Sequence, residues 1–177
     1  MKEDIITRKI NTPAGKMILG SYEDKLCLCD WVENHRRESN NYRIQRYLRS
    51  AFAIGTTPVI EQTIAQLEEY FAGKRKVFDI PFMYTGSEFQ CQVWDELRRI
   101  PYGSVITYSE QARRIGRPTA LRAVGLADGS NPLAIIIPCH RVIGIENKLV
   151  GYAGGLDAKK FLLNLEQENL LQALNHR

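Results

Sequence analysis

A cysteine, a histidine and an arginine stand side by side at Cys139-His140-Arg141. The thiolate is the nucleophilic form of cysteine, and neighbouring cationic or hydrogen-bonding groups favour it. Adjacent side chains in an extended chain rarely hydrogen-bond each other, so we expect His140 to act on Cys139 through a water. Such a base needs a third group to orient it. The alternative, from these residues alone, is a structural buried cysteine beside an unrelated histidine.

The flanking sequence predicts the elements that position these residues. Residues 133–137 form an apolar run between two prolines, which predicts a buried extended segment leading to the cysteine. Further upstream, Ser87 with Gln90 is a capping box that predicts the start of a helix. The expected buried face of that helix comprises Phe89, Val93, Leu97 and Ile100.

A helix-turn-helix is predicted between these two segments. Thr107 and Glu110 form a second capping box, and Gly116 is placed to end its helix in the left-handed conformation. Pro118 is placed to open the next helix, whose expected inward-facing residues are Leu121 and Val124. The second helix of such a unit usually enters a groove of DNA.

Positive charge is concentrated on the same stretch. Residues 98–122 hold six arginines and one glutamate, a local net charge of +5. Arginine suits planar hydrogen bonding to phosphate and stacking on bases, although a solvated helix face is the alternative for such a cluster. Combined with the helix-turn-helix, the cluster favours nucleic-acid binding. Its members are Arg98, Arg99, Arg113, Arg114, Arg117 and Arg122.

The first third of the chain has the pattern of strands. Residues 5–10 and 16–20 flank a turn rich in Asn, Pro and Gly, and residues 26–32 follow a charged tip. These segments predict a three-stranded β-meander. Residues 33–50 are polar and basic and receive no assignment.

A helix and a boundary follow the meander. Thr57 as cap and Pro58 at the first helical position predict a helix that ends at Gly73, with Ile60, Ile64, Leu67 and Phe71 as its buried stripe. Residues 79–83 predict a short strand. The linker at 84–86 divides the chain into a β-rich α/β domain, residues 1–84, and a second domain, residues 85–177.

Composition excludes several classes of protein. The chain has 177 residues, a net charge of +4 and 44% apolar residues, as expected for a globular protein with a real core. It has no run of 18 apolar residues that would span a membrane. The charged N-terminus lacks the apolar core of a secretory signal, and four cysteines are too few for a disulfide scaffold. We therefore expect a cytoplasmic protein.

A metal site is considered at Cys27, Cys29 and His35. Zinc normally takes four ligands, and the sequence offers no evident fourth ligand here. The two cysteines alternate along a predicted strand, so we interpret them as packing residues, and we expect neither metal nor cofactor.

At the motif level, Pro138-Cys139-His140-Arg141-Val142-Ile143-Gly144 resembles the active-site signature of the O6-alkylguanine-DNA alkyltransferases. The resemblance extends over residues 85–168 and includes Arg122-Ala123-Val124-Gly125, Asn131-Pro132, Gly151-Tyr152-Ala153-Gly154-Gly155 and the helix holding Glu166. It implies an α/β (α+β) fold. The first domain would be a ribonuclease H-like β-meander with a helix, and the second a helical, winged-helix-like domain with the helix-turn-helix.

The resemblance implies roles for individual residues. Cys139 would accept the alkyl group, and Glu166 and His140 would supply its thiolate through a water. Arg122 would enter the base stack from the minor groove in place of a flipped nucleotide. Tyr108 would promote flipping and protonate the leaving guanine.

The remaining implied roles concern the phosphates and the base. Arg113, Arg114 and Arg117 would lie near the phosphates. Asn131 would bridge the helix and the active-site segment, and the pocket would be completed by Val142, Tyr152, Ala153 and Gly154. The implied reaction is a single-turnover methylated-DNA–[protein]-cysteine S-methyltransferase reaction on O6-alkylguanine and O4-alkylthymine in duplex DNA. A monomer without a protein partner would carry it out.

Two positions depart from the pattern. Asp128 stands where close relatives more often carry Asn, and Ala134 stands where some carry Pro. An acid near a phosphate backbone would weaken affinity for DNA slightly, unless its side chain points elsewhere.

Two other functions are weighed against alkyl transfer. A lesion-binding sensor of the same fold would replace the reactive cysteine, often with Trp, so Cys139 argues against it. An unrelated Cys-His hydrolase would turn over repeatedly and would not need the arginine-lined helix-turn-helix.

Overall fold

The computed structural model describes residues 2–176 and begins with a four-stranded sheet. Strands β1 (Ile5–Thr12), β2 (Gly15–Tyr22) and β3 (Lys25–Trp31) form the predicted antiparallel meander, which is confirmed. A short strand that the sequence did not predict, β4 (Phe52–Ile54), pairs in parallel with β1 and gives the order β3-β2-β1-β4.

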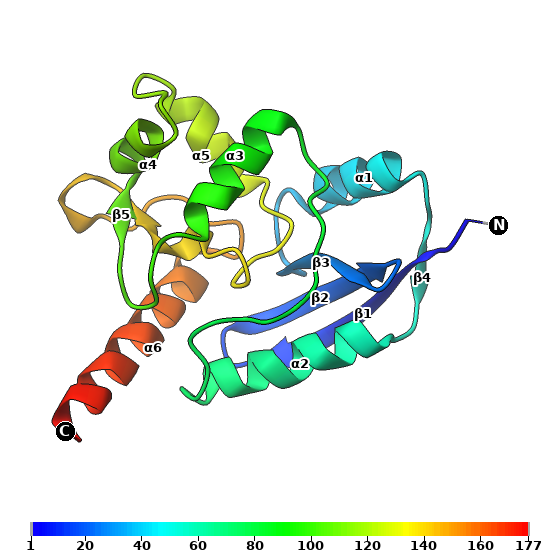
Figure 1. Cartoon of the computed structure of the whole chain (residues 1–177), viewed down its shortest axis with the longest axis horizontal. Helices are drawn as coiled ribbons and strands as arrows, with labels where there is room; N and C mark the ends of the chain where they lie inside the picture. The colour runs from blue at the N-terminus through cyan, green and yellow to red at the C-terminus, as the bar shows by residue number, and fades with distance from the viewer. Residues whose placement is uncertain (1, 177) are drawn as a thin grey trace.

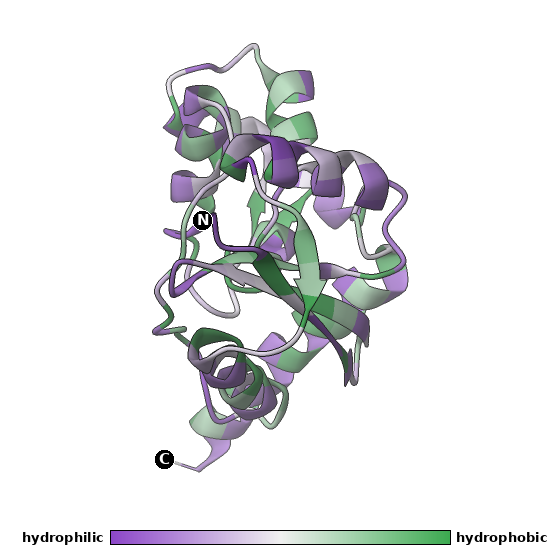
Figure 2. Ribbon diagram, turned by 90° about the vertical axis from the view of Figure 1, so that its right-hand side faces the viewer, coloured by the Kyte–Doolittle hydropathy of each residue, from purple (hydrophilic) through white to green (hydrophobic). Residues whose placement is uncertain are grey.

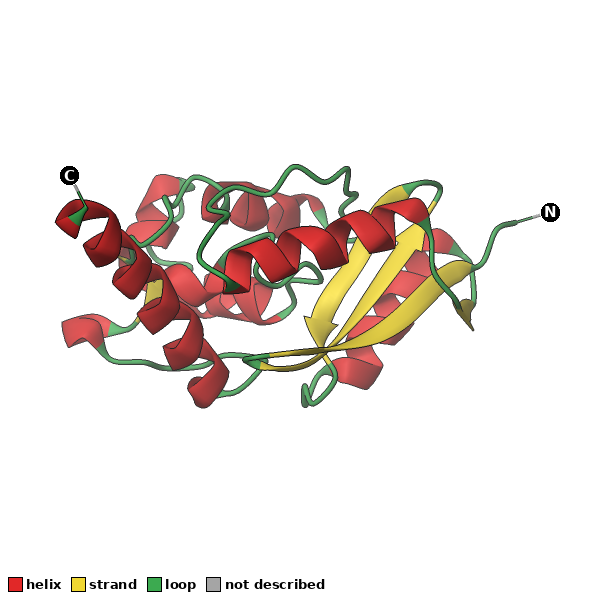
Figure 3. Ribbon diagram, turned by 90° about the horizontal axis from the view of Figure 1, so that it is seen from below, coloured by secondary structure: helices red, strands yellow, loops and turns green. Residues whose placement is uncertain are grey.

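Two helices cover opposite faces of this sheet (Figures 1 and 3). The unassigned segment 33–50 contains α1 (Arg37–Leu48), whose Ile44 packs with Ile5 and Cys27. Helix α2 (Pro58–Phe71) packs Ile60 and Leu67 on the core formed by the other face. The Thr57 side chain accepts a hydrogen bond from the Ile60 amide, so the predicted cap is confirmed.

The strand predicted at residues 79–83 is wrong. Only Phe82 forms a bridge, to Leu26, and the segment is otherwise irregular. The Leu26 amide donates to the Pro81 carbonyl at 2.9 Å and the Met83 amide donates to the Leu26 carbonyl at 3.0 Å. Pro81 has no N–H to continue the ladder, which accounts for the single bridge.

The second half is mainly helical and contains α3 (Glu88–Leu97), α4 (Tyr108–Arg114), α5 (Leu121–Gly129) and α6 (Leu156–Asn175). Two-residue strands, β5 (Ile106–Thr107) and β6 (Val142–Ile143), pair in parallel. Two 3₁₀ turns, Cys139–Arg141 and Ile145–Asn147, complete this half.

Both predicted caps exist, but they differ in completeness. The Ser87–Gln90 capping box of α3 has both reciprocal hydrogen bonds and is confirmed. Thr107 accepts from the Glu110 amide, whereas the Glu110 carboxylate pairs with Arg113 and Arg114 instead of closing the box.

The predicted start of the second helix of the helix-turn-helix is wrong. Helix α5 begins at Leu121 rather than at Pro118, and Leu121 is 44% exposed rather than inward. After Gly116, at φ 72°, the chain closes a separate turn in which the Ala120 amide donates to the Arg117 carbonyl at 3.0 Å. Because of that turn, α5 begins three residues later than predicted. Val124 is buried as expected.

The two halves share one hydrophobic core. Trp31 and Met17 from the sheet cluster with Val93 and Trp94 from α3. Figure 2 shows the strands as mainly hydrophobic, with hydrophilic residues on the surrounding helices. The division into residues 1–84 and 85–177 stays a prediction.

Within residues 2–176, no helix has both the length and the apolar character that crossing a membrane requires.

Candidate active site

Cys139 begins a 3₁₀ turn, and the segment before it is not the extended strand that the sequence predicts. Ile135 has a φ of 71°, and the Ile137 amide donates to the Leu133 carbonyl at 2.7 Å, so the chain reverses within the apolar run. An apolar run shows that a segment is buried but does not distinguish an extended segment from a tight turn. The prediction of burial was right and that of an extended conformation was wrong.

Asn131 holds this turn in place. Its Oδ1 accepts from the Leu133 amide at 3.0 Å, and its Nδ2 donates to the Ile137 carbonyl at 2.8 Å. The same Nδ2 lies 3.2 Å from the Cys139 Sγ and donates to it. One side chain therefore links the end of α5, the turn and the nucleophile.

Cys139 is protonated in the resting protein. Only 8% of its surface is exposed, and burial raises the pKa of its thiol to about 12, although the hydrogen bond from Asn131 opposes the rise. A thiol in this state needs a base in order to react near neutral pH.

The base sits in a buried cluster around Glu166, which we call the Glu166 cluster: Tyr70, Gly103, His140, Arg141 and Glu166. Oε2 of Glu166 pairs with His140 Nε2 and accepts from Tyr70 Oη at 2.7 Å. Oε1 accepts from Arg141 Nε at 2.8 Å and from the Gly103 amide at 2.9 Å. Burial would raise the pKa of Glu166, but His140 and Arg141 lower it to about 2, so the carboxylate is ionised.

This arrangement fixes the tautomer of His140. An ionised carboxylate only accepts, so His140 Nε2 carries the proton and Nδ1 carries the lone pair. Nδ1 has no hydrogen-bond partner among residues 2–176. Burial lowers the pKa of His140, which keeps the imidazole neutral and able to take a proton.

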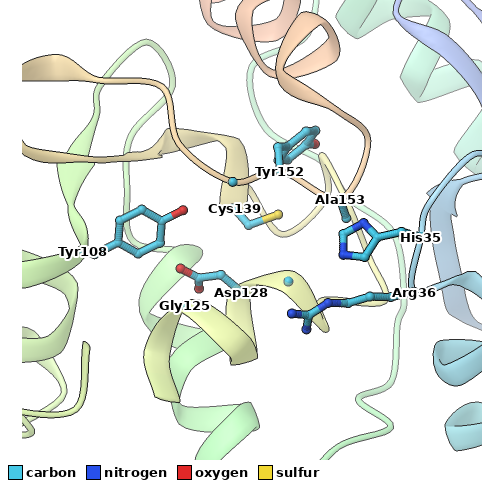
Figure 4. A pocket seen from close by; sticks show the side chains of 10 residues that line it. His35, Arg36, Tyr108, Gly125, Asp128, Cys139, Tyr152 and Ala153 are labelled. Carbon is cyan, nitrogen blue, oxygen red and sulfur yellow. The ribbon is translucent and has the colours of Figure 1, made fainter. Parts of the chain in front are cut away.

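The reactive sulfur faces a pocket of about 210 Å3, which we call the Cys139 pocket (Figure 4). Three of its predicted neighbours, Tyr108, Tyr152 and Ala153, line this pocket. Asn131, Val142 and Gly154, which were also predicted for the pocket, are not among its lining residues. The other lining residues are His35, Arg36, Gly125, Asp128, Gly129 and Gly151.

Two tyrosines define opposite parts of the pocket wall. Tyr108 Oη donates to the Val150 carbonyl at 3.2 Å, and burial raises the pKa of this phenol, so it is a protonated donor. Tyr152 Oη accepts from Trp31 Nε1 at 3.2 Å. A Cβ on Gly154 would lie 2.6 Å from the Trp31 ring, so this position requires glycine.

Several residues that support the site were not found from the sequence. Lys159 is fully buried and donates to the carbonyls of Val142, Val150 and Gly151 at 2.6, 3.2 and 3.3 Å, which ties α6 to the pocket loop. Tyr70 continues the buried face of α2, a helical-spacing signal that predicts burial but not its partner 96 residues away.

The N-terminal half also reaches the pocket. His35 and Arg36 line it, and Arg36 Nη1 donates to the Leu126 carbonyl at 3.3 Å. Arg43 Nη2 donates to the Ser130 carbonyl at 2.6 Å. Cys27 and Cys29 are buried in two different core clusters, away from His35 at the pocket.

The predicted DNA-binding arginines differ in their present contacts. Arg113 and Arg114 pair with Glu110, and the Arg117 guanidinium lies 5.5 Å from the centre of the Phe89 ring. Arg122 is exposed in the first turn of α5 and makes no ion pair with another described residue.

Asp128 points into the Cys139 pocket rather than toward solvent (Figure 4). It is 7% exposed, and its Oδ1 accepts from Gln111 Nε2 at 2.7 Å. Of the two alternatives for this acid, the structure therefore favours the one in which the side chain points elsewhere than toward a phosphate backbone.

Comparison with known proteins places this chain in a family. Residues 5–84 match the ribonuclease-like domain of 6-O-methylguanine DNA methyltransferase, and residues 88–168 match its DNA binding domain. A methylated-DNA–protein-cysteine methyltransferase of Methanosarcina barkeri is 45% identical over 161 residues, which are 91% of this chain and 96% of that protein. A constitutive methylated-DNA–protein-cysteine methyltransferase of Bacillus subtilis is 40% identical over 162 residues, covering 88% and 92%.

A solved structure agrees with these relatives. The crystal structure of Mycobacterium tuberculosis OGT in complex with DNA matches with a TM-score of 0.79 and 39% identity, covering 93% of this chain and 94% of that one. The mixed α/β fold expected from the sequence is confirmed. On these matches, the chain belongs to the 6-O-methylguanine DNA methyltransferase family.

Proposed function

We propose that this protein repairs duplex DNA by moving the alkyl group of O6-alkylguanine, and of O4-alkylthymine, irreversibly onto Cys139. The observation that carries the proposal is a buried thiol that lines a pocket and adjoins a neutral histidine backed by an ionised glutamate. Family membership supports it, since the matched relatives are named methylated-DNA–protein-cysteine methyltransferases.

The reaction replaces one bond to the alkyl carbon with another. His140 takes the thiol proton through a water, and the Cys139 sulfur attacks as the bond to guanine O6 breaks. Tyr108 donates a proton to the guanine ring, which avoids release of an anionic base. Overall, the Cys139 thiol loses a proton and gains the alkyl group, while the base loses the alkyl group and gains a proton to become guanine.

The Glu166 cluster makes this proton transfer possible. When His140 becomes an imidazolium, the adjacent Glu166 carboxylate stabilises the positive charge. Arg141, Tyr70 and the Gly103 amide keep that carboxylate in position. The product is a thioether, which no group in the pocket can cleave, so each molecule reacts once.

Access to the alkyl carbon requires base flipping, which costs a few kcal/mol. We propose that Arg122, exposed at the start of α5, enters the stack from the minor groove and offsets part of that cost. Tyr108 would crowd the adjacent phosphate and promote flipping. Arg113, Arg114 and Arg117 would contact the backbone, with Arg113 and Arg114 exchanging Glu110 for phosphate.

The base would occupy the Cys139 pocket, with Tyr152 and the backbone of Ala153 at its wall. The carbonyls of Cys139 and Val142 would accept from the guanine amino group. Asn131 would keep Cys139 in register with α5 through the hydrogen bonds described above. Gly154 would let this loop pack on Trp31.

The chain would act as a cytoplasmic monomer without cofactor or protein partner, with residues 1–84 and 85–177 as its two domains. Size-exclusion chromatography with light scattering should give one chain per particle. A mass of two chains would contradict this part of the proposal.

One experiment tests the reaction. The protein is incubated with duplex DNA carrying methyl-labelled O6-methylguanine, and label on each protein molecule is counted and mapped. We expect one label per molecule, on Cys139, and none on Cys139→Ala. Binding without transfer would favour a lesion sensor, and continued turnover would favour a Cys-His hydrolase.

A further inference from the structure

Asp128 is the acidic residue among those that line the Cys139 pocket, and the reaction above does not use it. It lies in the last turn of α5, and its side chain lines the Cys139 pocket together with Cys139 and Tyr108 (Figure 4). Burying a carboxyl group beside a reactive thiol is costly unless the carboxyl is neutral or paired.

Only one of the two carboxyl oxygens of Asp128 has a hydrogen-bond partner among the described residues. Oδ1 accepts from Gln111 Nε2 at 2.7 Å, whereas Oδ2 is buried and has no partner in the part of the chain that the structure describes. Since Gln111 occupies Oδ1 as a donor, a proton on the carboxyl group belongs on Oδ2. A protonated Oδ2 is a donor inside the pocket.

Charged and titratable groups from four other segments lie near this carboxyl. They are Tyr108 on α4, Lys159 on α6, Cys139 on the 3₁₀ turn, and His35 and Arg36 from the loop after β3. Lys159 favours the ionised form, but its ammonium already donates to three carbonyls. Burial outweighs it and raises the pKa of Asp128 to about 8.

Oε1 of Gln111 is also buried without a partner among the described residues, and the substrate would bring further acceptors into the pocket. In O6-alkylguanine the ring nitrogens N1, N3 and N7 all accept hydrogen bonds, and only the amino group donates. A neutral Asp128 can donate to one of these nitrogens. An ionised Asp128 loses that donor and also opposes the negative charge that develops on the Cys139 sulfur.

We propose that Asp128 is a substrate-contacting residue, which works as a neutral acid and donates from Oδ2 to a ring nitrogen of the flipped base. This inference rests on the proposed function. It predicts that the rate of alkyl transfer falls when Asp128, rather than the nucleophile, loses its proton at mildly alkaline pH.

The test compares the wild-type protein with Asp128→Asn. In this variant Gln111 still finds an acceptor at Oδ1, and the Nδ2 amide takes the place of Oδ2 as a permanent donor. The rate constant of methyl transfer from an O6-methylguanine duplex is measured from pH 6 to pH 9.5. Dividing the variant's rate by the wild-type rate cancels contributions that do not depend on Asp128.

The expected ratio is close to constant up to pH 7 and about tenfold larger at pH 9, because a group with a pKa of about 8 is then mostly ionised. In the wild type alone, the slope of log rate against pH should fall by one unit near pH 8. A flat ratio with no such break would overturn the inference. Asp157→Asn, which neutralises an exposed acid at the start of α6, should leave the profile unchanged.

A second set of substrates tests whether Asp128 acts as a hydrogen-bond donor or only through its charge. Deaza analogues of O6-methylguanine replace one ring nitrogen at a time with C–H. The analogue that lacks the nitrogen accepting from Asp128 should lower the wild-type rate at pH 7 and flatten the ratio, whereas loss of the nitrogen that Tyr108 protonates should lower the rate without flattening the ratio. Equal responses to all three analogues would reject the hydrogen bond. Absence of label on Cys139 at every pH and with every substrate would instead reject the proposed function.

Discussion

Behind the nucleophile, Glu166 accepts four hydrogen bonds in the Glu166 cluster, whereas Asp128 in the Cys139 pocket accepts one. Both carboxyl groups are buried, yet their pKa values move in opposite directions. The difference follows from the hydrogen bonds and charges of His140 and Arg141 beside Glu166, whereas Asp128 accepts only from the neutral Gln111 amide.

The two regions also differ in what they do. The side chains of the Glu166 cluster are buried and both carboxylate oxygens are paired, so substitutions there should affect both stability and transfer. In the pocket and at the adjoining start of α5, some polar groups have no partner in the described chain, among them Arg122 and the Asp128 Oδ2. Such groups can bind the substrate. Substitutions in the two regions should therefore separate stability from transfer.

The largest effect is expected for Glu166→Gln. It leaves the Arg141 guanidinium buried without its counter-charge, which should cost about 3–5 kcal/mol of unfolding free energy. Loss of the imidazolium's partner should also slow transfer by roughly 100-fold or more, on duplex and free base alike. Denaturant titration and single-turnover kinetics measure the two effects. Glu168→Gln, an exposed change on the same helix, should alter neither, and an intact transfer rate in Glu166→Gln would contradict the relay.

Tyr108→Phe should reduce transfer without loss of folding. Removing the proton donor should slow the chemical step by about 100-fold while DNA binding persists. Rapid-quench kinetics and fluorescence anisotropy give the two quantities. Tyr102→Phe, whose hydroxyl accepts from Asn169 outside the pocket, is the control. Wild-type transfer by Tyr108→Phe would remove its role as proton donor.

Arg122→Ala should affect only duplex substrates. We expect roughly tenfold to 100-fold slower transfer from duplex DNA, since flipping costs a few kcal/mol, and an unchanged rate with free O6-methylguanine base. Arg46→Ala removes an equal charge from the exposed face of α1 and should have little effect. Equal losses on both substrates would place Arg122 in the chemistry instead.

The smallest effect on transfer at pH 7 is expected for Asp128→Asn, which should instead show a pH-dependent gap in stability from the wild type. The folded protein keeps the Asp128 proton up to about pH 8, while the unfolded chain releases it near pH 4. Wild-type stability should therefore fall relative to the variant as pH rises through this window. Thermal unfolding at several pH values checks it, and a constant gap would mean that Asp128 titrates normally.

Local signals predicted the starts of α2, α3 and α4 but not the start of α5. The caps at Thr57 and Ser87 depend on hydrogen bonds within a few residues, so the sequence contains the whole interaction. Cys139, His140 and Glu166 were predicted through a family motif. Their roles stay predictions that the kinetics above test.

Long-range packing accounts for what the sequence did not predict. Tyr70 meets Glu166 across 96 positions, and Lys159 reaches carbonyls on two other segments. The left-handed Ile135 is unexpected for a β-branched residue, and the three hydrogen bonds of Asn131 make that turn possible. No spacing rule shows that Asp128 turns inward, because its orientation depends on Gln111 from another helix.

The state of His140 is the most direct test of how Cys139 is activated. The chain has three histidines, so ¹⁵N-labelled histidine gives a spectrum simple enough to assign. At pH 7 we predict that His140 is neutral, with a proton on Nε2 and a lone pair on Nδ1. An imidazolium, or a proton on Nδ1, would contradict the account, because neither form can accept the thiol proton.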